Sequence, residues 1–218
     1  GYKLLKDLYP DYNFIKETDS LRNEILNLIR NIREDYTTTF VDDVVLIREF
    51  SDLRWLQCLD NPLIESVIVR TSRCFNRNFN TDEEIIPRPV IDKDNIYDWT
   101  TATSPHWSHP ITVCGFICRK EDIYNNIANI KNQFNNINEM EDYLVQRGTE
   151  RKLMVCLDNH IIVELCLNRV QETHGSPCGE ITAKYLNDIF LTGKRMYVDE
   201  KSLIGDFLRI KNVEVEWN

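Results

Sequence analysis

Apolar residues recur with helical spacing in two parts of the chain. The first stripe follows the candidate N-cap Ser20 and consists of Leu21, Ile25, Leu28, Ile32 and Tyr36. The second consists of Ile123, Ile127, Ile130, Phe134 and Ile137. Intervals of three and four residues predict amphipathic helices with one buried face each. Further helices are predicted before Gly148, from about Glu180 to Thr192 and near 201–209, with Gly193 ending the second of these.

Runs of β-branched and aromatic residues alternate with these helical segments. Strands are predicted at 37–41, 44–50, 66–75 and 111–118, and shorter ones near 195–199 and 213–217. Asp158-Asn159 separates two apolar runs, Arg151–Leu157 and His160–Val170. A turn dipeptide between two such runs is typical of a β-hairpin, so we expect these runs to pair with each other.

The order of elements predicts the fold class. Strands and helices are mixed without a βαβ rhythm, and the expected hairpin favours antiparallel pairing. We therefore predict a single α+β domain over 18–218, with a mostly antiparallel sheet and helices packed on one face. Residues 1–17 are expected to form an N-terminal extension. Residues 76–110 contain four prolines and no clear periodicity, and are expected to form a long irregular loop.

Composition and charge narrow the classes of function. The chain has 218 residues, of which 42% are hydrophobic and 28% charged, which excludes a disordered protein. Its 26 Lys and Arg residues are outnumbered by 35 Asp and Glu residues, giving a net charge of −9. This balance argues against non-specific nucleic-acid binding. The longest apolar runs have the length of a strand, so no membrane association is expected.

Cysteine usage indicates the compartment. The seven cysteines are an odd number, and several lie within apolar strand-like runs, where reduced thiols act as small core residues. There is no secretory signal and no N-x-Ser/Thr sequon. A reducing, cytoplasmic location is therefore predicted. The abundance of Ile and Asn is typical of AT-rich genomes and favours a viral or parasite protein.

One candidate catalytic pair lies in the segment Thr173–Glu180. Cys178 stands among small residues at the expected start of a helix, where backbone N–H groups lower a thiol pKa. His174 lies four residues earlier and could serve as its base. The alternative is a turn that leads into the helix, with Cys178 as a small residue near the cap.

Two groups of residues raise the question of a metal. His106, His109, Cys114 and Cys118 are zinc-ligand types, but in a strand over 111–118 the two cysteines would lie about 13 Å apart. Ligand sulfurs that share one zinc lie within about 4 Å of each other. Asp82-Glu83-Glu84 and Asp92-x-Asp94 could hold Mg²⁺ or Mn²⁺ in an acidic nuclease, although solvated loop acids explain them as well. We expect no metal and no other cofactor.

Aromatic residues in the proline-bearing loop suggest a binding surface. Trp99 and Trp107, with Tyr97, His106 and His109, lie where the predicted elements do not bury them. Tryptophan and tyrosine are favoured anchors for protein partners. The alternative is that these rings cover the core. The sequence thus predicts a non-enzymatic interaction module with a protein partner, such as a viral or parasite accessory or polyprotein domain. A thiol-dependent hydrolase using Cys178 with His174 and a metal-dependent nuclease are the alternatives.

Overall fold

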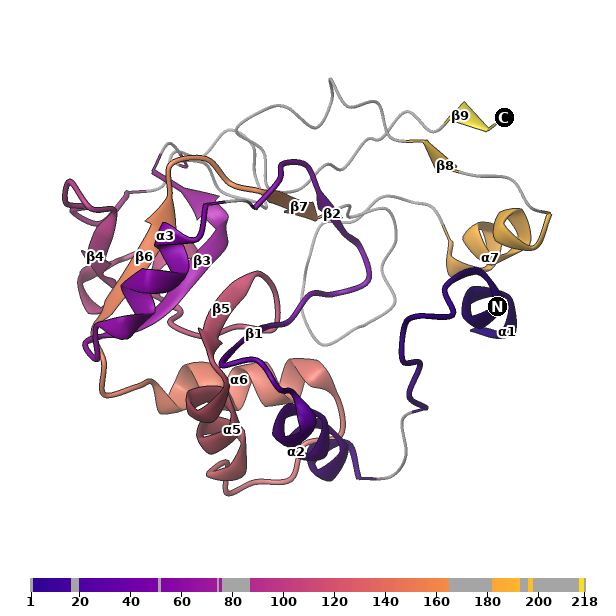
Figure 1. Cartoon of the computed structure of the whole chain (residues 1–218), viewed down its shortest axis with the longest axis horizontal. Helices are drawn as coiled ribbons and strands as arrows, with labels where there is room; N and C mark the ends of the chain where they lie inside the picture. The colour runs from indigo at the N-terminus through magenta and orange to yellow at the C-terminus, as the bar shows by residue number, and fades with distance from the viewer. Residues whose placement is uncertain are drawn as a thin grey trace.

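A mixed five-stranded sheet forms the centre of the protein (Figure 1). In this computed structural model, the residues described are 2–16, 20–50, 52–73, 75, 87–164, 182–192, 196–197 and 216–217. The strand order is β1 (Tyr36–Thr38), β5 (Phe116–Arg119), β3 (Ile64–Ser72), β6 (Leu153–Leu157) and β4 (Ile96–Asp98). β3 and β6 are parallel, and the other pairings are antiparallel. The predicted α+β class with a mostly antiparallel sheet is confirmed.

Alternate residues of the central strands enter two separate cores. Ile68 of β3 belongs to the cluster covered by α2 (Leu21–Asn31), α5 (Lys120–Ala128) and α6 (Ile137–Arg147). Its neighbours Val67 and Val69 belong to the cluster on the other side, where α3 (Arg54–Gln57) packs. Side chains of a strand point alternately to the two faces, so both faces of β3 are buried. Helices therefore cover both faces, and not one as predicted from the sequence.

The predicted hairpin after Arg151 is wrong. β6 pairs with β3 on one side and β4 on the other, whereas β7 (Ile162–Glu164) pairs with β2 (Val44–Leu46) in a separate two-stranded sheet. Met154, Val155 and Cys156 are fully buried. A strand that is apolar on both faces is typical of a sheet interior with a neighbour on each side. Asp158-Asn159 thus connects two different sheets.

The second apolar stripe is divided between two helices. α5 ends at Ala128 and α6 begins at Ile137, while Ile130 and Phe134 of the connection are still buried. Asn136 is the N-cap of α6, and its side-chain oxygen accepts a hydrogen bond from the Glu139 N–H at 2.9 Å. Asparagine competes for backbone hydrogen bonds and favours caps over helix interiors, so this asparagine-rich segment interrupts the helix.

The region expected to be one irregular loop contains regular elements in its described part. Residues 87–110 include β4, the 3₁₀ helix η2 (Trp99–Thr101) and α4 (Pro105–Ser108). The strand expected over 111–118 begins only at Phe116, because Gly115 has a φ of +72°. That left-handed conformation ends the extended run that β-branched residues would otherwise favour.

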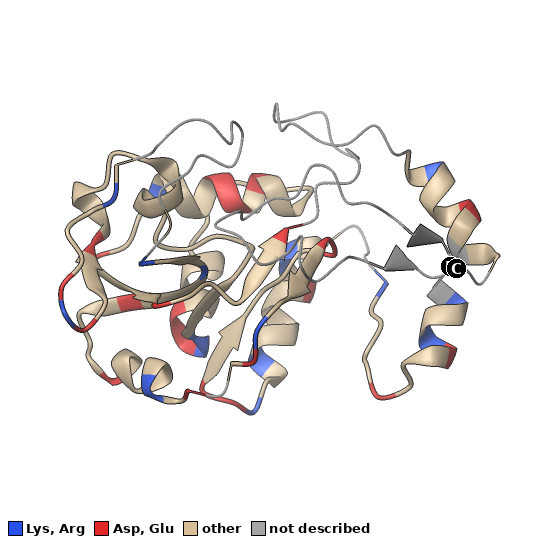
Figure 2. Ribbon diagram, turned by 90° about the horizontal axis from the view of Figure 1, so that it is seen from above, with Lys and Arg blue, Asp and Glu red and all other residues tan. Residues whose placement is uncertain are grey.

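The remaining elements are short. α1 (Tyr2–Leu8) ends before Pro10, and α7 (Ala183–Leu191) lies within the helix predicted over 180–192. β8 (Met196–Tyr197) pairs with β9 (Glu216–Trp217), near the two strands predicted there. The 3₁₀ helix η1 (Cys58–Asp60) follows α3. α1 and α7 lie away from the five-stranded sheet in both views (Figures 1 and 2). Among the described residues, no helix has the length and apolarity required to cross a bilayer.

Candidate functional site

The carboxyl ends of the two parallel strands meet at one edge of the central sheet. Ser72, the last residue of β3, is in register with Leu157, the last residue of β6. The Arg73 N–H donates to the Leu157 carbonyl at 2.9 Å, which places Arg73 beside Asp158 along this edge. Open sheets commonly bind ligands just beyond the carboxyl ends of their parallel strands. This edge is therefore the first place to look for a site.

A strained asparagine holds the carboxylate at this edge. Asn95 is 3% exposed and has a φ of +62°, which is costly for a residue with a Cβ. Its side-chain amide donates to Asp158 Oδ1 at 2.8 Å, and its carbonyl accepts from the Cys156 N–H at 3.0 Å. Two anchors of this kind fix the Asp158 carboxylate relative to β6. The carboxylate remains exposed and accessible to a ligand.

A small pocket opens beside Asp158. It has a volume of about 190 Å³ and is lined by Arg48, Glu49, Phe50, Asp52, Trp55, Leu157, Asp158, Asn159 and Ile161. Trp55 reaches it from α3 on one side of the sheet. The Arg48 guanidinium donates to the His160 carbonyl at 2.5 Å, which keeps that side chain in place. An aromatic surface combined with a few oriented polar groups is typical of sites for small ligands.

Two arginines form a basic pocket on the same edge. It has a volume of about 590 Å³ and is lined by Arg73, Arg88, Pro89 and Ile91. The Arg73 guanidinium donates to the Asp92 carbonyl, and Arg88 donates to the Arg73 carbonyl. The Arg73 Nε is buried and has no hydrogen-bond partner among the described residues. Two adjacent guanidinium groups form a place where an anion could bind.

Asp92 has a structural role in the same region. Its Oδ1 accepts hydrogen bonds from the N–H groups of Asp94 and Ile96, at 2.9 and 2.8 Å. This turn leads the chain through Asn95 into β4. The Asp92 side chain thus stabilises the turn that holds Asn95 in its left-handed conformation. Among the described residues, no group of three or more metal-ligand side chains gathers.

Two of the aromatic residues predicted to bind a partner lie in the core. Trp107 is 0% exposed and Tyr97 is 2% exposed. Their ring centroids are 5.3 Å apart in an edge-to-face arrangement, which favours the alternative reading in which these rings fill the core. Burial raises the pKa of the Tyr97 hydroxyl well above its ordinary value. Trp99 is half-buried, and its indole N–H donates to the Arg151 carbonyl at 2.8 Å.

The two predicted histidines are half-buried. His106 stacks edge-on against Phe75, with ring centroids 5.9 Å apart. Burial lowers the pKa of His109, and the positive charge of Arg70 acts in the same direction. His106 thus packs against a core residue, and the binding role predicted for the five residues remains a prediction.

The candidate catalytic pair Cys178 and His174 lies outside the described residues, as does Asp82-Glu83-Glu84. Their roles remain predictions. Cys114 and Cys118 are buried, and burial raises the pKa of both thiols far above the ordinary value. These two cysteines are therefore core residues with little thiolate at neutral pH.

Sequence reasoning missed Arg73, Asn95 and Asp158. The available signal was that Arg73 and Asp158 each come directly after an apolar run that forms a strand. The assumption of a hairpin hid this signal, because it assigned Asp158 to a turn. Parallel pairing of β3 with β6 is what brings the two residues to one edge.

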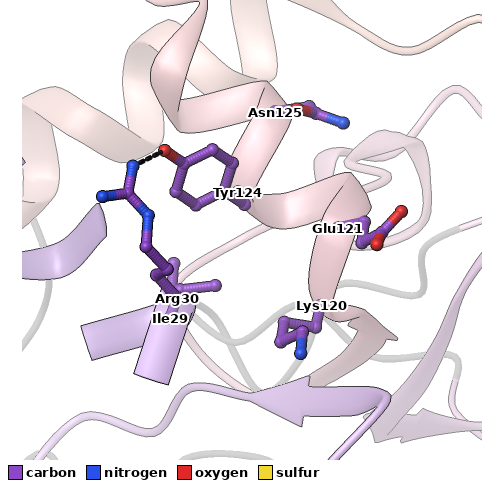
Figure 3. A pocket seen from close by; sticks show the side chains of 6 residues that line it. All are labelled: Ile29, Arg30, Lys120, Glu121, Tyr124 and Asn125. Atoms are coloured by element: carbon purple, nitrogen blue, oxygen red, sulfur yellow. Dashed lines mark hydrogen bonds between the residues drawn. The ribbon is translucent and has the colours of Figure 1, made fainter. Parts of the chain in front are cut away.

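A further pocket lies between α2 and α5 (Figure 3). The Arg30 guanidinium donates to the Tyr124 hydroxyl, the hydrogen bond drawn as a dashed line in Figure 3. The same guanidinium lies 5.4 Å from the centroid of the Tyr124 ring. Lys120, further along α5, donates to the Ile32 carbonyl at 3.1 Å. Both cations already make hydrogen bonds between the segments of α2 and α5, so this pocket is part of the contact between the two helices.

Comparison with known proteins adds one observation. No family model matches the chain, and no solved structure matches it either. The bifunctional glycosyltransferase pgtA of Dictyostelium discoideum is 23% identical to it in an alignment 229 residues long. That alignment covers 92% of this chain. The chain spans 30% of the length of that protein. The similarity thus extends over nearly the whole chain and corresponds to one part of a longer enzyme.

Proposed function

We propose that this chain is a glycosyltransferase domain whose sugar donor binds at the carboxyl edge of β3 and β6. The observation that carries the proposal is the similarity to a bifunctional glycosyltransferase over 92% of the chain. The geometry of the edge supports it, because an anchored carboxylate, a half-buried tryptophan and two arginines lie along it. The proposal assigns this chain a single glycosyl transfer.

The chemistry of glycosyl transfer assigns a role to each of these groups. An acceptor oxygen forms a bond to the anomeric carbon of the donor, and the bond from that carbon to the leaving phosphate oxygen breaks. The phosphate takes the electron pair, and the acceptor proton passes to a base. Arg73 and Arg88 would stabilise the negative charge on the phosphate. Asp158 would accept the proton, and Trp55 would pack against the sugar ring.

The experiment is a donor-cleavage assay on the purified chain. A panel of UDP- and GDP-sugars is incubated with the protein, with and without Mg²⁺ or Mn²⁺. Water serves as the acceptor, and release of nucleoside diphosphate is measured. We expect one donor to be cleaved. Asp158→Asn should lower the rate by about 10²-fold or more, since a positioned base typically contributes 10²–10⁴-fold. Arg73→Gln should weaken donor binding. Asp11→Asn, an exposed carboxylate in the N-terminal segment, is the matched control.

Two results would contradict the proposal. One is that no donor of the panel is bound or cleaved under any of the metal conditions. The other is that Asp158→Asn and Arg73→Gln cleave a donor as fast as the parent. The interaction module predicted from the sequence stays a prediction, and two of its proposed anchors, Tyr97 and Trp107, are buried.

A further inference from the structure

A second polar pocket lies at the opposite end of the same two strands. It has a volume of about 450 Å³ and is lined by Glu65, Asp122, Asn125, Asn126, Arg147, Gly148, Thr149, Glu150 and Arg151. Glu65 is the second residue of β3, and Arg151 lies two residues before β6. Glu65 and Ser72 are seven residues apart on one strand, or about 23 Å. This pocket is therefore distinct from the carboxyl edge.

Glu65 is the unusual group in this pocket. It is 1% exposed, and its Oε2 lies 3.5 Å from the Arg151 guanidinium. Its Oε1 is also buried and has no hydrogen-bond partner among the described residues. Burial raises the pKa of this carboxyl, against the opposing effects of Arg151 and of the neighbouring Thr149 hydroxyl. That hydroxyl donates its proton to the Arg151 carbonyl at 2.8 Å, so it is not available as a donor to Glu65 Oε1. A buried carboxyl oxygen without a donor is costly, and it is a ready acceptor for a ligand that brings one.

The rest of the pocket is held rigidly around Glu65. Arg151 donates to Asp122 Oδ2 at 2.5 Å and to the Pro62 carbonyl at 2.8 Å. Arg119 donates to the same Asp122 oxygen at 3.1 Å. The Arg147 guanidinium donates to the Asn126 carbonyl at 3.0 Å. These bonds fix the polar groups before any ligand arrives, which reduces the entropy cost of binding.

The charges of the pocket indicate which ligand it takes. Three carboxyl groups line the pocket, from Glu65, Asp122 and Glu150, together with the two guanidinium groups of Arg147 and Arg151. A third guanidinium, that of Arg119, contacts Asp122, so positive and negative charges nearly balance. An anion would face the unpartnered carboxyl oxygen, and a cation would face the guanidinium groups. A neutral ligand with several hydroxyls meets neither repulsion. It can both donate to Glu65 and accept from backbone or side-chain donors.

We propose that this pocket binds a neutral polyhydroxylated ligand, a monosaccharide unit, through a hydroxyl that donates to Glu65 Oε1. The proposal does not depend on glycosyl transfer at the carboxyl edge, because the pocket is built from other residues. It places a sugar site at the amino end of β3.

The test uses the indole N–H signals of the uniformly ¹⁵N-labelled chain. The sequence has four tryptophans, of which Trp99 donates its indole N–H to the Arg151 carbonyl and Trp55 lines the pocket at the carboxyl edge. Free glucose, galactose, mannose, fucose and xylose are titrated separately, without any nucleotide. We expect at least one sugar to shift the Trp99 signal saturably while the signal of the buried Trp107 stays in place. Trp99→Phe assigns the reporter.

Three variants sharpen the test. Glu65→Leu removes both acceptor oxygens at similar size, and should weaken sugar binding by about tenfold or more. Glu65→Gln keeps one acceptor oxygen and should weaken binding less, and its thermal melt checks that the fold is intact. Glu121→Gln is the control: Glu121 precedes Asp122 on α5 but lies outside this pocket, so this variant should bind the sugar with the parent affinity. The proposal is overturned if no sugar shifts the Trp99 signal saturably, or if both Glu65 variants bind with the parent affinity. Shifts confined to Trp55 would likewise overturn it, while leaving the carboxyl-edge proposal standing.

Discussion

Replacing Trp107 by alanine tests whether the aromatic residues near α4 belong to the core. The indole is 0% exposed, and its neighbours Tyr97 and Phe75 lie at ring-centroid distances of 5.3 and 6.2 Å. Its Nε1 has no hydrogen-bond partner among the described residues, so its contribution comes from packing. Truncation of a buried tryptophan costs about 3–5 kcal/mol. For a chain of this size, each kcal/mol corresponds to about 2–4 °C, so the melting temperature should fall by about 6–20 °C.

The assay is thermal and urea unfolding of the parent, Trp107→Ala and Trp107→Phe. The phenylalanine variant is the matched control, since it keeps an aromatic ring and removes a buried N–H group. Its cost should therefore stay below about 2 kcal/mol. If Trp107→Ala unfolds within about 2 °C of the parent, the ring is not a core residue. The partner-binding role predicted from the sequence would then be the better explanation for it.

Four further outcomes are expected. Gly115→Ala should destabilise the fold by at least about 1–2 kcal/mol in urea unfolding, because φ is +72° there and the new Cβ would lie 2.5 Å from Ile162 Cδ1; an unchanged midpoint would contradict the backbone geometry. Burial raises the pKa of Glu65 in the folded protein above 4.5, its usual value in the unfolded chain. The parent should therefore lose stability as the pH rises from 4.5 to the raised pKa of the folded state. The stability of Glu65→Gln relative to the parent should therefore increase between pH 4 and pH 7 in urea titrations, and a constant difference would refute this. Burial raises the pKa of all four described cysteines, to about 12 for Cys156, but only Cys58 is partly exposed. With iodoacetamide at pH 8, Cys58 should therefore react before Cys114, Cys118 and Cys156. At pH 6, an activated Cys178 should react fastest of all seven, and uniformly slow labelling would exclude the thiol-enzyme hypothesis.

Local sequence patterns predicted where helices and strands form better than they predicted which strands pair with each other. α2 lies within its apolar stripe, with Ser20 as its N-cap, and α1 ends just before Pro10. The stripe did not show that the chain leaves the helix after Asn31, where Ile32 is already extended. Apolar spacing also continued across the gap between α5 and α6, because Ile130 and Phe134 are buried without being helical. Periodicity reports burial, and burial does not require the helix to continue.

Pairing was harder to predict because it depends on residues far apart in the sequence. An apolar run followed by Asp-Asn and another apolar run has the local signature of a hairpin. Nothing local to β6 shows that it instead pairs with β3 and β4. The same long-range pairing brings Arg73 to Asp158 and closes the pocket around Glu65. The candidate sites were therefore hidden from sequence reasoning for the same reason as the topology.

The parallel pairing of β3 with β6 also determines when the domain can fold during synthesis. Ile64 pairs with Leu153, so the centre of the sheet joins residues 89 positions apart. Contacts over such separations slow folding, because the loop entropy is lost before the contacts form. β3 cannot acquire its β6 neighbour until residue 157 has left the ribosome. Until then, Val67 and Val69 lack a strand partner on that side, and the nascent chain exposes an apolar, aggregation-prone edge that chaperones would have to protect. A truncated chain that ends before Leu153 would keep that exposed edge permanently.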